Sequence, residues 1–214
     1  MTNPSPERAA RKDVIGDEEF NAMMDKADKL TPMIHRLRTR ALLCMLRLTG
    51  KRRGEIANLS LQDFRSSETL MNVTFTLEKK RKGSVMKRSV VKGLPLDDPL
   101  TGPIIEYLNL LQQLDPIPLY FLPRTFNLFG NGWGFDPDNH LGGRQVLNLF
   151  REVSDRAWPH LMRETVGAEI IKGDPSIFGV FKVKQRLDHE DLKTSMGYLQ
   201  RYATDVIRRE GLEL

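Results

Sequence analysis

The chain has 214 residues, of which 40% are hydrophobic, which is enough for one domain with a substantial core. Its net charge of +5 and its pI near 9.4 favour a polyanionic partner only weakly, because the distribution of charge matters more than its sum. The single cysteine, Cys44, excludes a disulfide framework, and the lack of a signal-like start or of about 18 consecutive apolar residues predicts a cytoplasmic protein without a membrane segment.

The N-terminal quarter is predicted to be helical after a short leader. Residues 1–16 are polar, basic and proline-containing, which is typical of a linker or flexible leader. Asp17 is expected to cap a first helix whose first turn is acidic. Apolar residues at helical spacing over residues 32–48 predict a long, half-buried helix that ends at Thr49-Gly50. Residues 51–61 are expected to form a further helix.

The pattern changes to that of strands at Met71. The sequence MNVTFTLE alternates apolar and polar residues, and VMKRSVVKGLPL is expected to return as a second strand that ends at Pro95. Between them, KKRKGS supplies a strongly basic turn. The simplest alternative for this turn is a solvated hairpin tip without a binding role.

The rest of the chain is predicted to be mainly helical. Residues 100–114 and 144–157 have helical periodicity, whereas residues 115–143 are expected to form an irregular aromatic loop without chemistry. Helices are expected to continue to the C-terminus with a break at residues 173–175 and a short tail from Ile207. The predicted fold class is therefore α+β, mainly α-helical, with a small antiparallel sheet near residues 71–96.

Residues able to cleave a phosphodiester gather between Trp158 and Tyr202. His160 and Arg163 are three residues apart, so they share one face of a helix, and His189 precedes Tyr198 by nine residues. Phosphodiester cleavage needs a nucleophile, cations on the phosphate oxygens and a group that moves protons. A lone histidine or tyrosine is usually structural, so the order and spacing carry the hypothesis.

A motif upstream completes the pattern. Thr49-Gly50-Lys51-Arg52 is followed by Glu55, so the chain resembles the catalytic domain of the tyrosine recombinase (phage integrase) family, whose first motif places an arginine after Thr-Gly-x and a glutamate three residues later. The second motif, His-x-x-Arg, matches His160 and Arg163. The third, a histidine nine residues before a tyrosine, matches His189 and Tyr198. The resemblance runs from about residue 17 to residue 202. Glu164 and Asp188 depart from it, at positions where relatives commonly have a histidine and a glycine.

The resemblance implies a site-specific recombinase or integrase that cleaves and rejoins DNA strands. Tyr198 would attack the phosphodiester and form a 3′-phosphotyrosyl intermediate, while Arg52 and Arg163 would clamp the phosphate. His160 would accept the proton of the tyrosine, and His189 would hydrogen-bond a phosphate oxygen. Such chemistry conserves the energy of the bond, so no cofactor, metal or ATP is expected. The supporting residue would be Glu55, which would orient the arginines.

Members of the family also use a hairpin lysine to protonate the leaving 5′-oxygen. Lys79 has the strand parity of the apolar residues before it and is our first choice, although Lys80 and Lys82 remain open. The hairpin residues expected to contact DNA are Lys80, Arg81 and Lys82. Tyr202 lies one turn after Tyr198 and is a competing nucleophile, but its distance from the preceding histidine fits the motif less well.

The resemblance also implies partners and a domain organisation. Double-stranded DNA and other recombinase protomers are expected, as a tetrameric synapse on DNA and a monomer in its absence, in the nucleoid and with no membrane partner. Residues 17–214 are expected to be the catalytic domain, without the N-terminal core-binding domain of relatives. We expect the segment 196–202 to be mobile, or docked away from the arginines, until protomers assemble. The alternatives are a type IB topoisomerase or telomere-resolvase-like strand transferase, and a DNA-binding module without catalysis.

Overall fold

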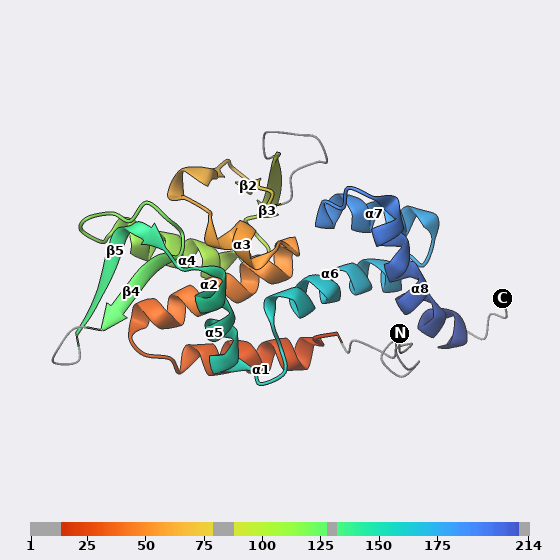
Figure 1. Cartoon of the computed structure of the whole chain (residues 1–214), viewed down its shortest axis with the longest axis horizontal. Helices are drawn as coiled ribbons and strands as arrows, with labels where there is room; N and C mark the ends of the chain where they lie inside the picture. The colour runs from red at the N-terminus through yellow and green to blue at the C-terminus, as the bar shows by residue number, and fades with distance from the viewer. Residues whose placement is uncertain (1–13, 79–87, 128–131, 210–214) are drawn as a thin grey trace, which may run out of the picture.

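The computed structural model describes residues 14–78, 88–127 and 132–209. Helices predominate within these residues, which also contain a three-stranded and a two-stranded antiparallel sheet. The predicted α+β, mainly α-helical fold is confirmed (Figure 1). In the same described part of the chain, no helix is both long enough and apolar enough to cross a membrane.

Two N-terminal helices form the base of the main core. Helix α1 (Asp17–Asp28) packs against α2 (Met33–Thr49), whose residues are mostly buried. Asp17 is the first residue of α1, not its cap; the cap position belongs to Gly16. Ile15, just before it, is buried, and its N–H donates to Thr165 Oγ1 at 2.9 Å.

Helix α2 ends as predicted, at Gly50. This glycine has φ 61° in the left-handed region, which favours a residue without a side chain. A Cβ there would also collide with Leu187, so the close approach of the last turn of α7 requires glycine as well. The end of α2 is thereby held against the segment that carries His189.

The predicted helix over residues 51–61 is much shorter than expected. Helix α3 spans only Arg53–Ala57, and a 3-10 turn, η2 (Leu61–Asp63), follows. The chain leaves the helix because Leu59 and Leu61 hydrogen-bond to the backbone of residues 119–121, and Ser60 bridges Tyr120. Such long-range pairing overrides a helical pattern that is read from local spacing.

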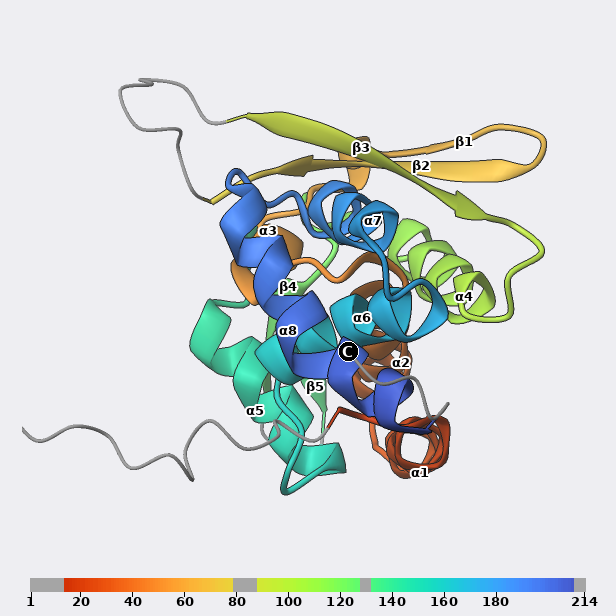
Figure 2. The same ribbon diagram turned by 90° about the vertical axis from the view of Figure 1, so that its right-hand side faces the viewer.

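The predicted hairpin is present and belongs to a three-stranded sheet. Strand β2 (Leu70–Thr76) lies between β1 (Phe64–Ser66) and β3 (Ser89–Pro95), and both neighbours are antiparallel to it. Val73 and Phe75 are buried, as their alternation predicted. Figure 2 shows this sheet lying across α3, α4 and α7.

The segment over residues 115–143 contains strands that we did not predict. After α4 (Thr101–Gln112), β4 (Pro123–Asn127) pairs antiparallel with β5 (Trp133–His140). The pairing has a register shift at Pro123/Arg124, and β5 itself contains Pro137, whose carbonyl accepts a hydrogen bond from Leu119 N. The prolines and glycines of this segment favoured a loop, and the expectation of an irregular loop was wrong.

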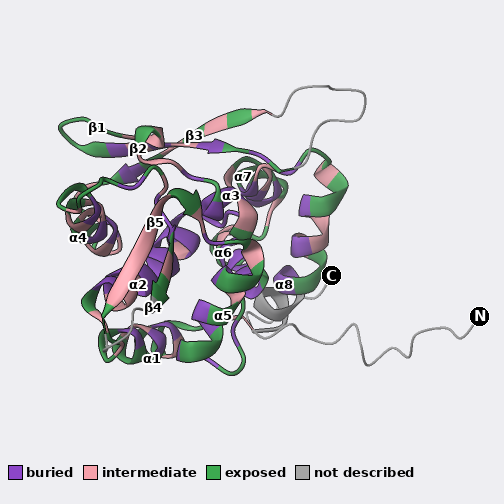
Figure 3. Ribbon diagram, turned by 60° about the vertical axis from the view of Figure 1, so that its left-hand side comes forward, coloured by how far each residue is buried: buried purple, intermediate pink, exposed green. Residues whose placement is uncertain are grey.

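The C-terminal helices form a second, smaller core. Helix α5 (Gly143–Val153) leads to α6 (Pro159–Gly173), which packs against α7 (Ile177–Leu187) and α8 (Leu192–Arg209). The break at residues 173–175 is confirmed, whereas α8 continues past Ile207, where we predicted a tail. Figure 3 shows the buried residues on the facing sides of these helices and along α2. The site lies where α2, α3, α6 and the α7–α8 turn meet.

Candidate active site

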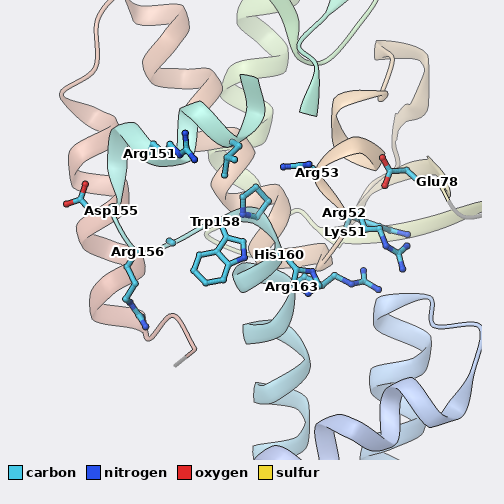
Figure 4. A pocket seen from close by; sticks show the side chains of 13 residues that line it. Lys51, Arg52, Arg53, Glu78, Arg151, Asp155, Arg156, Trp158, His160 and Arg163 are labelled. Atoms are coloured by element: carbon cyan, nitrogen blue, oxygen red, sulfur yellow. The ribbon is translucent and has the colours of Figure 1, made fainter. Parts of the chain in front are cut away.

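The predicted phosphate-binding arginines line one basic cleft. Arg52 at the start of α3, together with His160 and Arg163 on α6, lines a cleft of about 600 Å³. Figure 4 shows Arg52 and Arg163 extending toward the same end of the cleft. Its wall also includes the side chains of Lys51, Arg53, Arg151 and Arg156, against the carboxylates of Glu78 and Asp155. The excess of cations makes the cleft suitable for a phosphodiester.

Arg163 is held by two backbone carbonyls. The side chain is buried, and its two terminal nitrogens donate to Gly50 O, at 2.5 Å, and to Leu187 O. These carbonyls belong to the ends of α2 and α7, where helices leave carbonyls without partners. Burial, and then the charge of Arg52, lower the pKa of Arg163. An arginine begins so far above neutrality that the guanidinium stays charged.

Glu55 holds Arg52 at the beginning of α3. Its Oε1 accepts from Arg52 Nη1 at 2.7 Å, and its Oε2 accepts from the Arg52 backbone N–H at 3.0 Å. Glu55 is buried, whereas the Arg52 side chain keeps 25% of its surface exposed. The carboxylate therefore fixes both ends of the arginine and leaves its guanidinium at the cleft. The supporting role expected for Glu55 stays a prediction, for which this contact gives a geometric basis.

His189 lies in the turn between α7 and α8. Its Nδ1 is 2.8 Å from Ser195 Oγ, and its ring lies 5.7 Å from the ring of Tyr198. Burial is the largest influence on the pKa of His189, followed by the charges of Arg163 and Arg52, and together they lower it to about 4. The imidazole is therefore neutral near pH 7, and it lines a smaller pocket together with Arg52.

Tyr198 is docked against α6 by its hydroxyl and by its ring. The side chain is 3% exposed, and its hydroxyl donates to Glu164 Oε2 at 3.2 Å. Tyr202 donates to the other oxygen, Oε1, at 3.2 Å, and Arg201 Nη1 lies 2.5 Å from the same atom. The Tyr198 ring rests on Gly167, where a Cβ would overlap it. Burial, followed by the charge of Glu164, raises the pKa of Tyr198.

Other predicted residues are placed less directly. His160 is exposed in the first turn of α6 and lines the large cleft, where Tyr198 is not among the described lining residues. The hairpin residues Lys79, Lys80, Arg81 and Lys82 lie outside the described residues. Within the described part of the chain, no group of 3 or more His, Cys, Asp or Glu side chains could hold a metal ion.

The sequence reading missed a charged cluster next to the site. Lys51 is fully buried, and its Nζ lies 2.5 Å from Asp188 Oδ2 and 4.7 Å from the centre of the Phe75 ring. Lys92 Nζ lies 3.1 Å from the other oxygen of Asp188. Burial lowers the pKa of Lys51 to about 8, against the opposing effect of Asp188. One signal was available, because Lys92 occupies an inward strand position between the apolar Val90 and Leu94.

Comparison with known proteins gives a family match over most of the chain. A family model described as the phage integrase family matches residues 13–204. A search of the curated proteins gave no match. The matched residues include every motif described above and both helical cores.

Solved structures resemble the fold at low sequence identity. The XerH site-specific recombinase bound to difH substrate is 16% identical with a TM-score of 0.59, and the match covers 86% of this chain and 49% of that one. XerA recombinase is 17% identical with a TM-score of 0.60, covering 98% and 66%. The Tn1549 transposon integrase in complex with circular intermediate DNA is 12% identical with a TM-score of 0.54, covering 88% and 61%. The chain thus spans about half the length of the XerH chain, and these likenesses concern the fold.

Proposed function

The chain belongs to the phage integrase family, and from this membership we propose that it is a site-specific DNA recombinase, or integrase, that cleaves and rejoins strands through a 3′-phosphotyrosyl intermediate. The observation that carries the proposal is the meeting of Arg52 and Arg163 at one basic cleft, beside a turn that holds His189 against Tyr198. This arrangement combines a nucleophile with fixed cations. It supports an enzyme over a DNA-binding module without catalysis.

In the proposed reaction, the Tyr198 oxygen attacks phosphorus and the bond from phosphorus to the 5′-oxygen breaks. The leaving oxygen takes up a proton and becomes a 5′-hydroxyl, and the phosphate stays on the tyrosine. A 5′-hydroxyl of a partner strand then attacks the phosphotyrosine, which restores the tyrosine and a phosphodiester. The number of phosphoester bonds is unchanged, so the exchange needs no external energy source.

The two arginines are proposed to bind the non-bridging oxygens of the phosphate. Negative charge increases on these oxygens in the transition state, and cations fixed beforehand stabilise it more than the ground state. The carbonyls that hold Arg163 and the carboxylate that holds Arg52 provide this fixation. Loss of one such donor is expected to slow cleavage about a hundredfold or more. The neutral His189 would donate a hydrogen bond to the same phosphate.

Proton transfer is the step that requires movement. We propose that His160 accepts the proton of Tyr198, and that a lysine of the hairpin, Lys79 in our reading, protonates the leaving oxygen. Support for His160 is its place in the cleft beside Arg163. In the structure the hydroxyl of Tyr198 donates to Glu164, so it must leave this carboxylate to attack. The described conformation corresponds to a resting state with a protonated nucleophile.

The proposed partners are double-stranded DNA and further copies of the protein. Among the similar structures are a XerH recombinase on its difH substrate and a lambda integrase tetramer bound to a Holliday junction. By analogy, this chain would act in a tetramer on DNA, with residues 17–214 as its catalytic domain and Lys80, Arg81 and Lys82 at phosphates. Such a protein would be associated with the nucleoid in the cytoplasm.

Covalent capture tests this function without knowledge of the target sequence. The protein is incubated at low salt with a pool of nicked duplexes that carry a randomised segment, and DNA that stays attached in denaturing detergent is sequenced. We expect an enriched motif from the wild type and no attached DNA from Tyr198→Phe. Tyr202→Phe is the matched control and should still become attached. Attachment that survives Tyr198→Phe and is lost in Tyr202→Phe would move the nucleophile, and salt-sensitive binding without attachment would contradict the enzyme.

A further inference from the structure

Asp188 has a left-handed backbone conformation, which is uncommon for residues other than glycine. It has φ 53° and ψ 41° at the end of α7. Among the described non-glycine residues, Asp188 alone has a positive φ. A side chain is strained in this left-handed region, which glycine enters readily. The adjacent residue, His189, belongs to the proposed site. Strain beside a functional residue is retained only where the surroundings fix it.

The carboxylate of Asp188 is fixed by two lysines from different elements. Lys51, in the link between α2 and α3, lies 2.5 Å from Oδ2, and Lys92, on β3, lies 3.1 Å from Oδ1. Lys92 also donates to Gln185 O in the last turn of α7, at 2.8 Å. The side chains of Lys51 and Asp188 are 0% and 8% exposed, so their charges compensate each other almost without water. We name Asp188, Lys51 and Lys92 the Asp188 cluster.

The cluster connects the backbones of the proposed catalytic residues. Lys51 directly precedes Arg52, and Asp188 directly precedes His189. On the other side of Asp188, the carbonyl of Leu187 accepts from Arg163. One ion pair therefore joins the two segments that supply Arg52 and His189, at the point where Arg163 also binds.

Stability alone gives a weak reason for such an arrangement. Replacing a buried ion pair by apolar residues of similar size is often neutral or stabilising, because two charges must be removed from water to form it. Here a glycine at position 188 would also relieve the backbone. An apolar residue at position 51 together with glycine at position 188 could thus stabilise the fold equally well. Such a pair, however, could not make a directional contact between the α7–α8 turn and the start of α3.

We propose that Asp188, through Lys51 and Lys92, is a positioning residue that sets His189 relative to Arg52 and Arg163. The contribution to cleavage rests on the proposed function, whereas the positioning of the turn does not. Asp188 would not touch the DNA, because both of its oxygens are engaged by lysines and it is nearly buried. Its effect would be on the rate of the chemical step and not on DNA affinity.

The decisive variant is the double substitution Lys51→Met/Asp188→Gly. It removes the charges of the Lys51–Asp188 pair together, keeps an apolar chain beside the Phe75 ring, and places glycine at the left-handed position. Lys92 keeps its hydrogen bond to Gln185 O. We expect a thermal midpoint close to that of the wild type. Amide hydrogen exchange at residues 189–191 should become about tenfold faster or more, because these amides lose the restraint on the turn while global stability is kept. Asparagine tolerates the same backbone region, so Asp188→Asn should have an exchange rate at residues 189–191 between those of the wild type and the double variant.

Cleavage is measured in parallel on a duplex recovered by the covalent capture. At saturating DNA, the double variant should form the phosphotyrosyl product at least about tenfold more slowly, since small misplacements of catalytic groups have effects of this size. The dissociation constant should change little, because the side chain of Lys51 is 0% exposed and the double substitution leaves the net charge of the chain unchanged. Unchanged exchange at residues 189–191 would overturn the positioning of the turn, and wild-type cleavage in the double variant would overturn its catalytic consequence. If exchange accelerates but the wild type itself forms no covalent product, the turn restraint is supported and the recombinase function fails.

Discussion

The hydroxyl of Tyr198 donates to Glu164 Oε2 at 3.2 Å, and this contact determines the state of the proposed nucleophile. A hydrogen bond to a buried carboxylate favours the protonated phenol, and the negative charge raises the pKa of Tyr198 in addition to the effect of burial. Arg201 lies over both tyrosine rings and pairs with the same carboxylate. Glu164 thus holds the tyrosine protonated and on α6.

Glu164→Gln is expected to accelerate the formation of the phosphotyrosyl product. The amide retains hydrogen bonding to the tyrosines but loses the charge, so the pKa of Tyr198 moves back toward its ordinary value and the hydroxyl separates more easily. The single-turnover rate at saturating DNA should rise about threefold to tenfold. Ultraviolet titration of tyrosine ionisation provides a second measurement and should begin at lower pH than in the wild type.

Tyr202→Phe provides the control for this substitution. It removes one hydrogen bond from Glu164 Oε1 and leaves the bond between Tyr198 and Oε2 in place. Its cleavage rate should change much less than that of Glu164→Gln. A cleavage rate in Glu164→Gln that falls tenfold or more would assign the opposite role to the carboxylate, as the group that takes the proton from the nucleophile.

Alanine substitutions at two glycines near Tyr198 distinguish the effect of docking the tyrosine ring from the effect of helix propensity on stability. A Cβ at Gly167 would overlap the Tyr198 ring, whereas at Gly197 the nearest atom is Arg201 Nη2 at 3.8 Å. Gly167→Ala should therefore lower the free energy of unfolding by about 1–3 kcal/mol through overpacking. Gly197→Ala should raise it by about 0.5–1 kcal/mol, because alanine is favoured within a helix.

Denaturant unfolding measures both effects, and chemical iodination reports the exposure of the tyrosine. Tyr198 should react faster in Gly167→Ala and at the wild-type rate in Gly197→Ala. Equal stability of the two variants would mean that the ring of Tyr198 moves away from α6 readily.

The sequence was informative where a pattern is local and less so where distant segments meet. The end of α2 at Gly50, the β2–β3 hairpin and the break after α6 follow from spacing and turn residues, and the structure has all three. The order of the motifs singled out Arg52, His160 and Arg163, which line one cleft, whereas His189 and Tyr198 are not among the described lining residues of that cleft. Motif order could not show that Tyr198 binds Glu164, because this contact depends on how α8 packs on α6.

The two departures from the family pattern became informative only in three dimensions. Asp188 was noted as a residue in place of a glycine, and the structure gives it the backbone angles that favour glycine. Its lysine partners are far away in sequence, so no window of residues could reveal the ion pairs. The short α3 has the same origin, since residues 59–61 hydrogen-bond to a segment about 60 positions later.

Arg52→Ala is expected to reduce both activity and stability, for separable reasons. Glu55 is 1% exposed and would lose the guanidinium that compensates its charge, which should lower the free energy of unfolding by about 1–3 kcal/mol. Adding Glu55→Gln removes the stranded charge, and the double variant should recover part of this loss. Cleavage should remain at least about a hundredfold slower in both, because the cation at the cleft is missing.

Thermal unfolding and single-turnover cleavage distinguish these contributions. Arg151→Ala serves as a matched control, because Arg151 lines the same cleft from the surface of α5 without a buried carboxylate partner among the described contacts. It should weaken DNA binding and change stability little. Full recovery of cleavage in Arg52→Ala/Glu55→Gln would remove Arg52 from the chemical step.

His189 is expected to make stability depend on pH in the acidic range. Its pKa is lowered to about 4 in the folded protein, against an ordinary value near 6.5, so the unfolded chain binds the proton first as the pH falls. Stability from the neutral ring is thus complete above about pH 6.5 and is lost progressively as the pH falls through 4. Between pH 7 and pH 4, the free energy of unfolding should fall by on the order of 1–3 kcal/mol because of this group.

An NMR titration of the histidine ring protons measures this directly, and denaturant unfolding at several pH values gives the energy. His189→Asn keeps an amide near the position of Nδ1, which contacts Ser195, but it cannot titrate, so the slope of stability between pH 7 and 4 should decrease. A midpoint for His189 near 6.5 would mean that the ring is hydrated and that the arginines do not act on it.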